Sequence, residues 1–185
     1  FSGTVDAATI TVFTQLDSNV AAADFDGNVV GNVVLTGGNG SGENATASFA
    51  GNVTGNITMT PNSGTGTAAT FDGTTAQTIT GNVVAGADGK GVLKITNTGG
   101  VVTFNDDVGV AGTGIEEIHI ASGATMTQKA LLTGDDLTFD VVTTVDADGA
   151  GTRGGTLIIE GGDAVSGTAG GAITLATITT DTALT

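Results

Sequence analysis

The feature that most constrains this chain is an internal repeat led by phenylalanine. Residues Phe25–Thr36 read FDGNVVGNVVLT and residues Phe49–Thr60 read FAGNVTGNITMT, so seven of twelve positions are identical. A third copy, FDGTTAQTITGNVV, begins at Phe71 after a nearly equal interval. A period of roughly 20 to 50 residues is typical of stacked architectures, in which each unit buries its apolar face only against the next. We therefore expect one elongated β-repeat domain over residues 1–185, with a soft boundary near 62–69.

The local pattern predicts an all-β fold. Short runs rich in Val, Ile and Thr, which suit a pleated and half-buried surface, alternate with Gly, Asn and Asp turn residues. The best helical candidate, Thr125–Thr133, is short and rich in threonine. The length of one repeat favours a β-solenoid, and the alternative is a jelly-roll-like β-sandwich with strand exchange between subunits. The predicted strands are Thr9–Phe13, Asn56–Thr60, Gln77–Thr80, Gly91–Thr96, Val101–Phe104, Ile115–Ile120, Leu137–Thr144, Thr156–Glu160 and Ala172–Thr179.

Five phenylalanines mark the successive repeats. Phe25, Phe49 and Phe71 are almost evenly spaced, whereas the intervals to Phe104 and then to Phe139 are clearly longer. Rings at equivalent positions of a solenoid would stack along its interior, whereas in a sandwich each ring would be an ordinary core residue. The wider spacing after Phe71 indicates that the repeat lengthens there or that the architecture changes.

Charge and composition exclude several classes of protein. The chain has 19 acidic and 4 basic residues and a net charge of -15, so the phosphates of nucleic acids or anionic lipids would be repelled. The chain has no cysteine, which excludes disulfides and thiolate-bound metals. No apolar run approaches the roughly 20 residues of a membrane-spanning helix. The start at Phe1 and the ending ITTDTALT favour a trimmed export product or a fragment.

The sequence offers little for catalysis, and we expect no enzyme. Nucleophilic catalysis needs a base beside the nucleophile, and the single histidine, His119, stands in IEEIHI without a nucleophile motif. Acid pairs could serve a glycosidase. The chain has no Trp or Tyr to provide a sugar platform, which weighs against sugar processing and against a carbohydrate-binding domain.

Calcium binding fits the acidic residues better than catalysis does, because hard cations prefer several carboxylate, amide and carbonyl oxygens near glycine turns. The alternative is that the acids cap turns and keep the surface soluble. No other cofactor is expected. The candidate calcium ligands are Asp24, Asp26, Asp106, Asp107, Asp146 and Asp148.

Four asparagines stand in N-x-[ST] sequons. Asn39, Asn44, Asn52 and Asn56 could carry glycans if the source has the machinery. Asn52 and Asn56 also occupy repeat positions that Asn28 and Asn32 fill without a sequon. For these positions we favour a ladder of asparagine side chains at the corners of the stack.

In the stretch Phe71–Ala124, five segments follow one another: AQTITGN, ADGKGVLKITN, a Gly pair, VTFNDDVG and IEEIHIASGAT. It resembles the β-strand repeats of large bacterial surface proteins, namely autotransporter passenger regions of the rickettsial outer-membrane-protein type and repeat-rich S-layer or adhesin proteins. The resemblance implies a non-enzymatic, extracellular, structural or adhesive protein. It would assemble with itself as a lattice or filament, or bind other cell-surface components.

The main rival is an extracellular filament subunit in which a terminal strand, such as Thr9–Phe13 or Ala172–Thr179, inserts into a neighbouring subunit. Strand addition to an open sheet edge is an efficient route to polymers. A subunit that exchanges strands should form ordered polymers, whereas an isolated solenoid fragment should stay monomeric or be poorly capped.

Overall fold

The structure is a computed structural model of the whole chain. It describes residues 1–14, 19–38, 42–60, 66–87, 90–109, 115–121 and 123–128, and beyond these only the backbone of six short strands between 137 and 180. The side chains of residues 116, 117 and 128 are also outside the description. Every described element is a β-strand.

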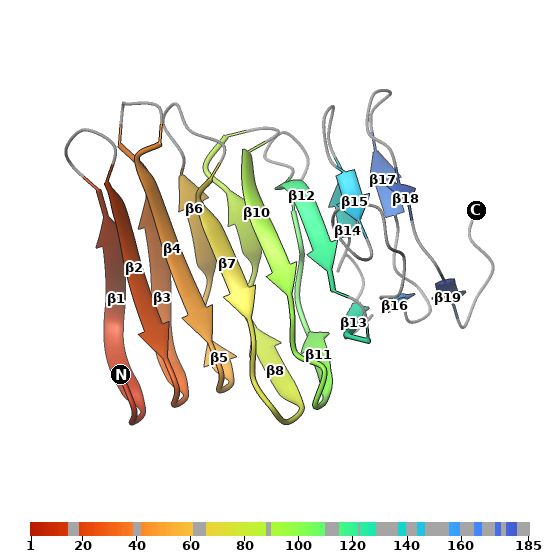
Figure 1. Cartoon of the computed structure of the whole chain (residues 1–185), viewed down its shortest axis with the longest axis horizontal. Helices are drawn as coiled ribbons and strands as arrows, with labels where there is room; N and C mark the ends of the chain where they lie inside the picture. Colours follow the sequence, from red (N-terminus) through yellow and green to blue (C-terminus); the bar gives the residue numbers. More distant parts are fainter. Residues whose placement is uncertain are drawn as a thin grey trace.

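Two parallel sheets form the body of the molecule, and Figure 1 shows their strands side by side from the N-terminal end. A small third sheet pairs β14 (Leu137–Phe139) with β17 (Val165–Gly167). Sheet A contains β1 (Val5–Phe13), β3 (Val29–Thr36), β5 (Val53–Thr54), β6 (Ile57–Thr60), β8 (Gln77–Thr80), β9 (Val83–Ala85), β11 (Val101–Phe104), β13 (Thr125–Gln128), β16 (Thr156–Ile159) and β19 (Thr177–Thr180). Sheet B contains β2 (Val20–Phe25), β4 (Asn44–Phe49), β7 (Ala68–Phe71), β10 (Lys90–Ile95), β12 (Ile115–Ile120), β15 (Thr144–Asp146) and β18 (Ile173–Thr174).

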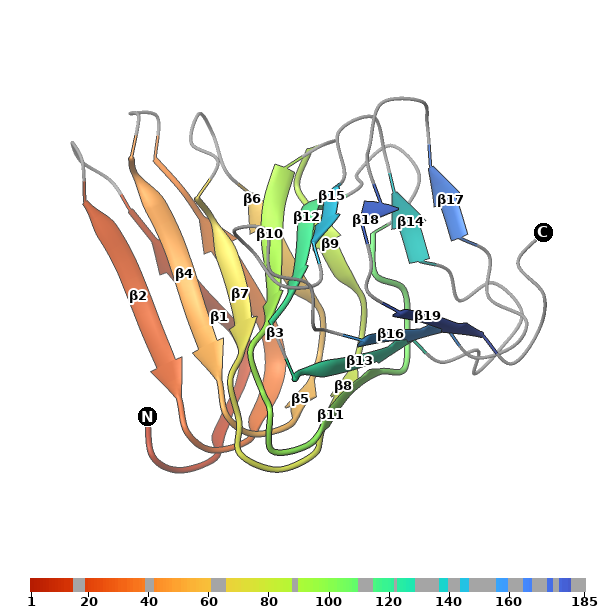
Figure 2. The same ribbon diagram turned by 45° about the vertical axis from the view of Figure 1, so that its right-hand side comes forward.

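The pairing confirms the β-solenoid. Phe25 pairs with Phe49, and Phe49 pairs with Phe71, so sheet B repeats at the interval of the phenylalanine motif. Both of these strand pairs are parallel, which requires a long crossover between neighbours and not a hairpin. The jelly-roll-like sandwich is therefore wrong for the described strands. The views in Figures 1 and 2 agree that each circuit of the chain, here called a rung, lies beside the previous one.

The phenylalanines form the stack that their spacing predicts, with one addition and one correction. The rings of Phe25, Phe49 and Phe71 stack at 5.4 and 5.3 Å between centroids, and all three are buried. Phe1 extends this stack at 5.2 Å from Phe25. Phe104 comes from sheet A and meets Phe71 edge-on, so it does not continue the stack. Phe139 lies in β14, where side chains are outside the description.

Sheet A supplies the other side of the core through columns of aliphatic residues in register. Val29, Val53 and Ile79 form one column, and Val33, Ile57 and Val83 form another. All six side chains are buried. Opposite them, sheet B places small residues beside the rings, because Ala23, Ala47 and Ala69 are also in register. These facing columns bury the apolar set of each rung against that of the next.

A glycine corner divides sheet A. The strand β3 is continuous, but in the next rung the same stretch splits into β5 and β6 around Gly55, and then into β8 and β9 around Gly81. Gly31, Gly55 and Gly81 all have positive φ, at 131°, 135° and 123°. A Cβ on Gly55 would overlap the carbonyl oxygen of Gly31, so the rungs approach too closely at this corner for any side chain.

Two buried amides hold a wider turn between sheets B and A. The step from Val53 to its partner Ile79 is longer than the step from Val29 to Val53, because the third rung carries extra residues before β8. Gln77 is buried there, and its Nε2 donates to the carbonyls of Phe49 at 2.7 Å and Gly51 at 2.9 Å. The Nδ2 of buried Asn97 donates to Gln77 Oε1 at 2.9 Å, which joins the third and fourth rungs.

Strand positions agree with the sequence predictions in most places. Gln77–Thr80, Val101–Phe104 and Ile115–Ile120 form strands over the predicted ranges. The helical candidate Thr125–Thr133 is wrong over its first part, because Thr125–Gln128 is strand β13, and its remaining residues lie outside the described part. Sheet B runs without a break through β7, which pairs with both β4 and β10 at the end of the predicted soft boundary at 62–69.

Candidate functional site: an acidic corner and two asparagine ladders

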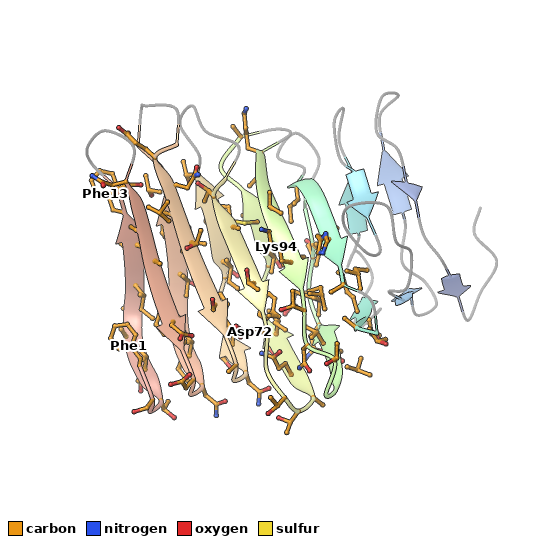
Figure 3. The ribbon with its side chains drawn as sticks, in the orientation of Figure 1. Phe1, Phe13, Asp72 and Lys94 are labelled. Atoms are coloured by element: carbon orange, nitrogen blue, oxygen red, sulfur yellow. The ribbon has the colours of Figure 1, made fainter. Side chains whose placement is uncertain are left out.

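Three carboxylates gather where the stacked phenylalanines leave sheet B. Asp26 and Asp72 each follow a stacked ring, and their N–H groups donate to the carbonyls of Phe1 at 2.9 Å and Phe49 at 3.1 Å. Asp24 precedes the corner at the end of β2. All three side chains are exposed, and Asp72 is labelled in Figure 3. The repeated Phe-Asp-Gly places these acids along one corner, with Ala50 between them in the intermediate rung.

The acids at this corner interact. Partial burial raises the pKa of Asp72 above its ordinary value, and the charges of Asp24 and then Asp26 raise that pKa further. A backbone hydrogen bond of Asp72 acts in the opposite direction. Like charges on one side of the corner therefore disfavour the ionised form of Asp72. The sequence predicts this corner in part, since Asp24 and Asp26 are calcium candidates, while Asp72 is recognisable from the repeated FDG motif.

The six predicted calcium ligands do not form one cluster. Asp24 and Asp26 share the acidic corner. Asp106 lies near the glycine corner of sheet A, where its Oδ2 accepts a 2.6 Å hydrogen bond from the N–H of Gly81, and Asp107 follows it. Asp146 ends β15, and Asp148 lies outside the described residues. Within the described part of the chain, no three or more His, Cys, Asp or Glu residues are placed to hold a metal. Calcium binding stays a prediction.

Two columns of asparagines connect successive rungs on the outside of sheet A. The Oδ1 of Asn28 accepts a 2.9 Å bond from the N–H of Asn52, and the Oδ1 of Asn52 accepts from Thr78 at 2.8 Å. The second column joins Asn32 to Asn56 and Asn56 to Asn82, each at 2.9 Å. The predicted asparagine ladder is thus confirmed. Each side chain accepts from a backbone N–H of the next rung. The second column does so beside the glycine corner, and the first column does so where the chain enters sheet A.

The remaining sequons are less informative. Asn44 begins β4, and its Oδ1 accepts a 3.2 Å hydrogen bond from the N–H of Gly66 in the next rung. Asn39 lies outside the described residues. Since Asn52 and Asn56 are used between rungs, the structure gives both sequons a structural role. Glycosylation of the four sites stays a prediction.

The lone histidine lies on the outer side of sheet B. His119 is half-buried between Ile118 and Ile120, which are both buried. In register, it stands between Lys94 and Asp146 of the neighbouring strands. The sequence gives no sign of this column of a base, a histidine and an acid, because the three residues come from different rungs and belong to no repeated motif.

Charge is distributed unevenly along the stack. From Gly27 to Ala87 the only ionisable residues are Glu43 and Asp72, although the whole chain has 19 acids. The outward positions of β3, β5, β6, β8 and β9 hold Asn, Thr and Val. The described middle rungs therefore present a largely uncharged polar surface on sheet A, and 17 of the 19 acids come before or after this segment in the sequence.

Neither the search for membrane-spanning helices nor the comparison with known proteins assigns a function to the chain. Among the residues that the structure describes, no helix has the length and apolarity needed to span a bilayer. Searches for related proteins found no matching family model, no matching curated protein and no matching solved structure.

Proposed function

We propose that this chain is a non-enzymatic structural segment of an extracellular assembly, such as a surface layer, an adhesin or a filament. The observation that carries the proposal is the continuous stack itself. Ring contacts, aliphatic columns and asparagine ladders repeat from rung to rung with nearly constant geometry. Such an architecture extends by adding rungs, and its stability is approximately a sum over neighbouring units.

The uncharged middle of the stack supports self-association. A chain with a net charge of -15 repels its copies over long distances. Across residues 27–87, however, two copies could approach with only Glu43 and Asp72 on each side. Threonine and asparagine side chains on this surface can donate and accept hydrogen bonds to a neighbour. Self-contact through the middle rungs is therefore the least opposed by charge.

The extracellular part of the proposal rests on the resemblance of Phe71–Ala124 to surface-protein repeats, and the non-enzymatic part rests on composition. The chain has no cysteine and a single histidine, and its described polar clusters serve the stack. The acidic corner at Asp24, Asp26 and Asp72 is a place where a divalent cation would reduce like-charge repulsion. Calcium in this proposal bridges assemblies and has no catalytic role.

Negative-stain electron microscopy of the purified chain tests the proposal. Samples are imaged with calcium, with a chelator, and with magnesium at the same ionic strength as a control for screening. We expect regular filaments or lattices. Dissolution by the chelator alone would identify calcium as the bridge, and assemblies indifferent to it would place the contacts between strands. Dispersed particles under every condition would refute self-assembly.

A further inference from the structure

The outer face of sheet B carries opposite charges at two places, with small residues between them. One outward column runs in register across four strands, from Asp24 on β2 through Ser48 and Thr70 to Lys94 on β10. Asp24 and Lys94 are exposed, and the two residues between them are half-buried. Figure 1 shows these four strands side by side, and Figure 3 labels Lys94 on the same face. The column therefore has an acid at one end, a base at the other and only small hydroxyl side chains between.

The charges of this face are too far apart to pair within one copy. Both lysines of the described part of the chain, Lys90 and Lys94, lie on β10. The register neighbours of Lys94 are Thr70 and His119, and Lys94 forms no ion pair with the described residues. Asp24 lies three strand spacings away, which is about 14 Å. A surface with separated patches of opposite charge pairs with a surface that presents the same charges in reverse order.

We propose that this face is a docking surface for a second copy of the chain, which packs on it about a two-fold axis parallel to the strands and midway between β4 and β7. The inference rests on the proposed function and names its contact. In such a pair the same patch is used on both copies, so β2 lies opposite β10 and β4 lies opposite β7. Asp24 then faces the partner's Lys94, and the same ion pair forms a second time by symmetry.

No like charges oppose each other in this arrangement. At the acidic corner, Asp26 lies opposite Thr96, and Asp72 lies opposite Ala50, because these positions follow the residues in register on the facing strands. Glu43, the other acid of the middle rungs, is buried. Small side chains on the two central strands allow the sheets to approach, so the long lysine side chain can reach the facing carboxylate. Because one chain supplies both halves of the complement, a copy fits this face better than an unrelated partner.

The size of the contact sets its strength. Four strands about 4.8 Å apart and up to six residues long give a face of about 19 by 20 Å, or about 400 Å² per copy. Stable interfaces bury about 800 Å² per partner. The pair should therefore be weak and concentration-dependent. At about 0.15 M salt the Debye length is about 8 Å, so the long-range repulsion between two chains of net charge -15 is screened while facing charges still interact.

Sedimentation equilibrium from micromolar to millimolar protein tests the docking surface, at about 0.15 M salt and with a chelator to exclude bridging by cations. Asp24→Lys places lysines opposite each other in the proposed pair, and Lys94→Glu places acids opposite each other. A mixture of the two variants restores both ion pairs, because substituted faces substituted and unchanged faces unchanged. Asp6→Lys, at an exposed position of β1 in sheet A, is the control with the same change of net charge as Asp24→Lys. Circular dichroism verifies that all variants fold.

We expect the wild type to approach twice its mass of 17.8 kDa at the highest concentrations. Asp24→Lys and Lys94→Glu should each weaken the association by about tenfold or more, because two attractions become two repulsions, and their mixture should associate about as tightly as the wild type. Asp6→Lys should leave the association unchanged or tighten it, because net repulsion falls. Asp24→Lys lowers the net charge equally and yet should weaken it.

Three results would overturn the docking surface: a wild type that stays monomeric, an Asp24→Lys variant that behaves like Asp6→Lys, or a mixture that associates no more tightly than its components. Electron microscopy separates this contact from the proposed function. Filaments or lattices that form equally in the wild type and in Lys94→Glu would overturn the contact while leaving the proposed function intact.

Discussion

The stacked rings make the sharpest test of the solenoid core. Phe49 is 1% exposed, and its ring lies 5.4 Å from Phe25 and 5.3 Å from Phe71, tilted by only 10° and 22°. Truncating a buried phenylalanine to alanine costs about 3 to 5 kcal/mol, because the transfer free energy is lost and a cavity remains. Phe49→Ala should therefore lower the free energy of unfolding by about 4 kcal/mol, a large part of the roughly 5 to 15 kcal/mol typical of a domain.

Two further variants separate stacking from burial. Phe49→Leu retains most of the apolar volume but loses two ring contacts, each worth about 0.5 to 1.5 kcal/mol, so we expect a loss of about 2 kcal/mol. Phe1→Ala removes a ring that is 69% exposed and has one stacked neighbour, so the loss should be about 1 kcal/mol or less. Phe1 is thus a matched control in the same column, with a stacked ring on one side only.

Urea unfolding followed by circular dichroism measures these differences, with the slope against denaturant checked for each variant. A change in slope would indicate that rungs unfold separately and that a single free energy does not apply. The stacked core would be refuted if Phe49→Ala cost no more than Phe1→Ala, or if Phe49→Leu cost as much as Phe49→Ala.

Four other substitutions probe the acidic corner, the glycine corner, the buried amides and the exposed asparagine ladder. Because the folded-state pKa of Asp72 is raised, its ionisation opposes folding above that pKa, and stability should increase as the pH falls from neutral toward the ordinary value of 3.8. Asp72→Asn should raise the melting temperature at pH 7 and have little effect at pH 3. Gly55→Ala should cost about 2 kcal/mol or more in urea unfolding, because φ is 135° and a Cβ would overlap Gly31. Asn97→Ala should cost about 3 kcal/mol by the same assay, since its buried side chain makes four hydrogen bonds, whereas Asn52→Ala should cost about 1 kcal/mol because its bonds are exposed.

Each of these predictions has an outcome that contradicts it. An equal gain from Asp72→Asn at pH 3 and pH 7 would show that charge is not the cause. A neutral Gly55→Ala would mean that the rungs are farther apart at the corner than described. Equal costs for Asn97→Ala and Asn52→Ala would remove the distinction between the buried network and the exposed ladder.

The repeat alone is enough to predict the stacking direction and the asparagine ladders. The Phe, Gly and Asn positions recur together, and each has a role that depends on its type: a ring that stacks, a corner without a side chain, and an amide that accepts from the next rung. The stacking of Phe1 on Phe25 can be predicted in the same way, because FSGTV at residues 1–5 is a further copy of the motif that starts at Phe25 and Phe49.

Sheet B is harder to predict. Its first strands, β2, β4 and β7, read VAAADF, NATASF and AATF, and alanine is depleted in ordinary strands. In this sheet, small residues are required beside the large rings. Ala23, Ala47 and Ala69 therefore form strands because of packing between rungs, which local strand propensity does not describe. The longer interval between β5 and β8 is also difficult to predict from the sequence. A glutamine is usually a surface residue, whereas Gln77 is buried in the turn that contains the extra residues.

The calcium candidates show the limit of local reasoning about sites. Nearness in sequence groups acid pairs such as Asp106–Asp107, but in the structure Asp106 bonds the N–H of Gly81 and belongs to another corner than Asp24 and Asp26. Asp72 interacts with Asp24 only because the stack aligns their rungs. A site that depends on the register between rungs becomes visible only when the rungs have been aligned.

The direction of the hydrogen bonds in this solenoid has a mechanical consequence. Strand-to-strand bonds run along the stack, so tension that separates its two ends would open one rung at a time, each by a similar force. A chain with this geometry would lengthen by steps under load and dissipate work at each step, and rungs could re-form from the remaining stack as a template. Force applied across the stack would instead load many bonds together. The molecule is thus suited to act as an extensible tether along one axis and as a rigid bar across it.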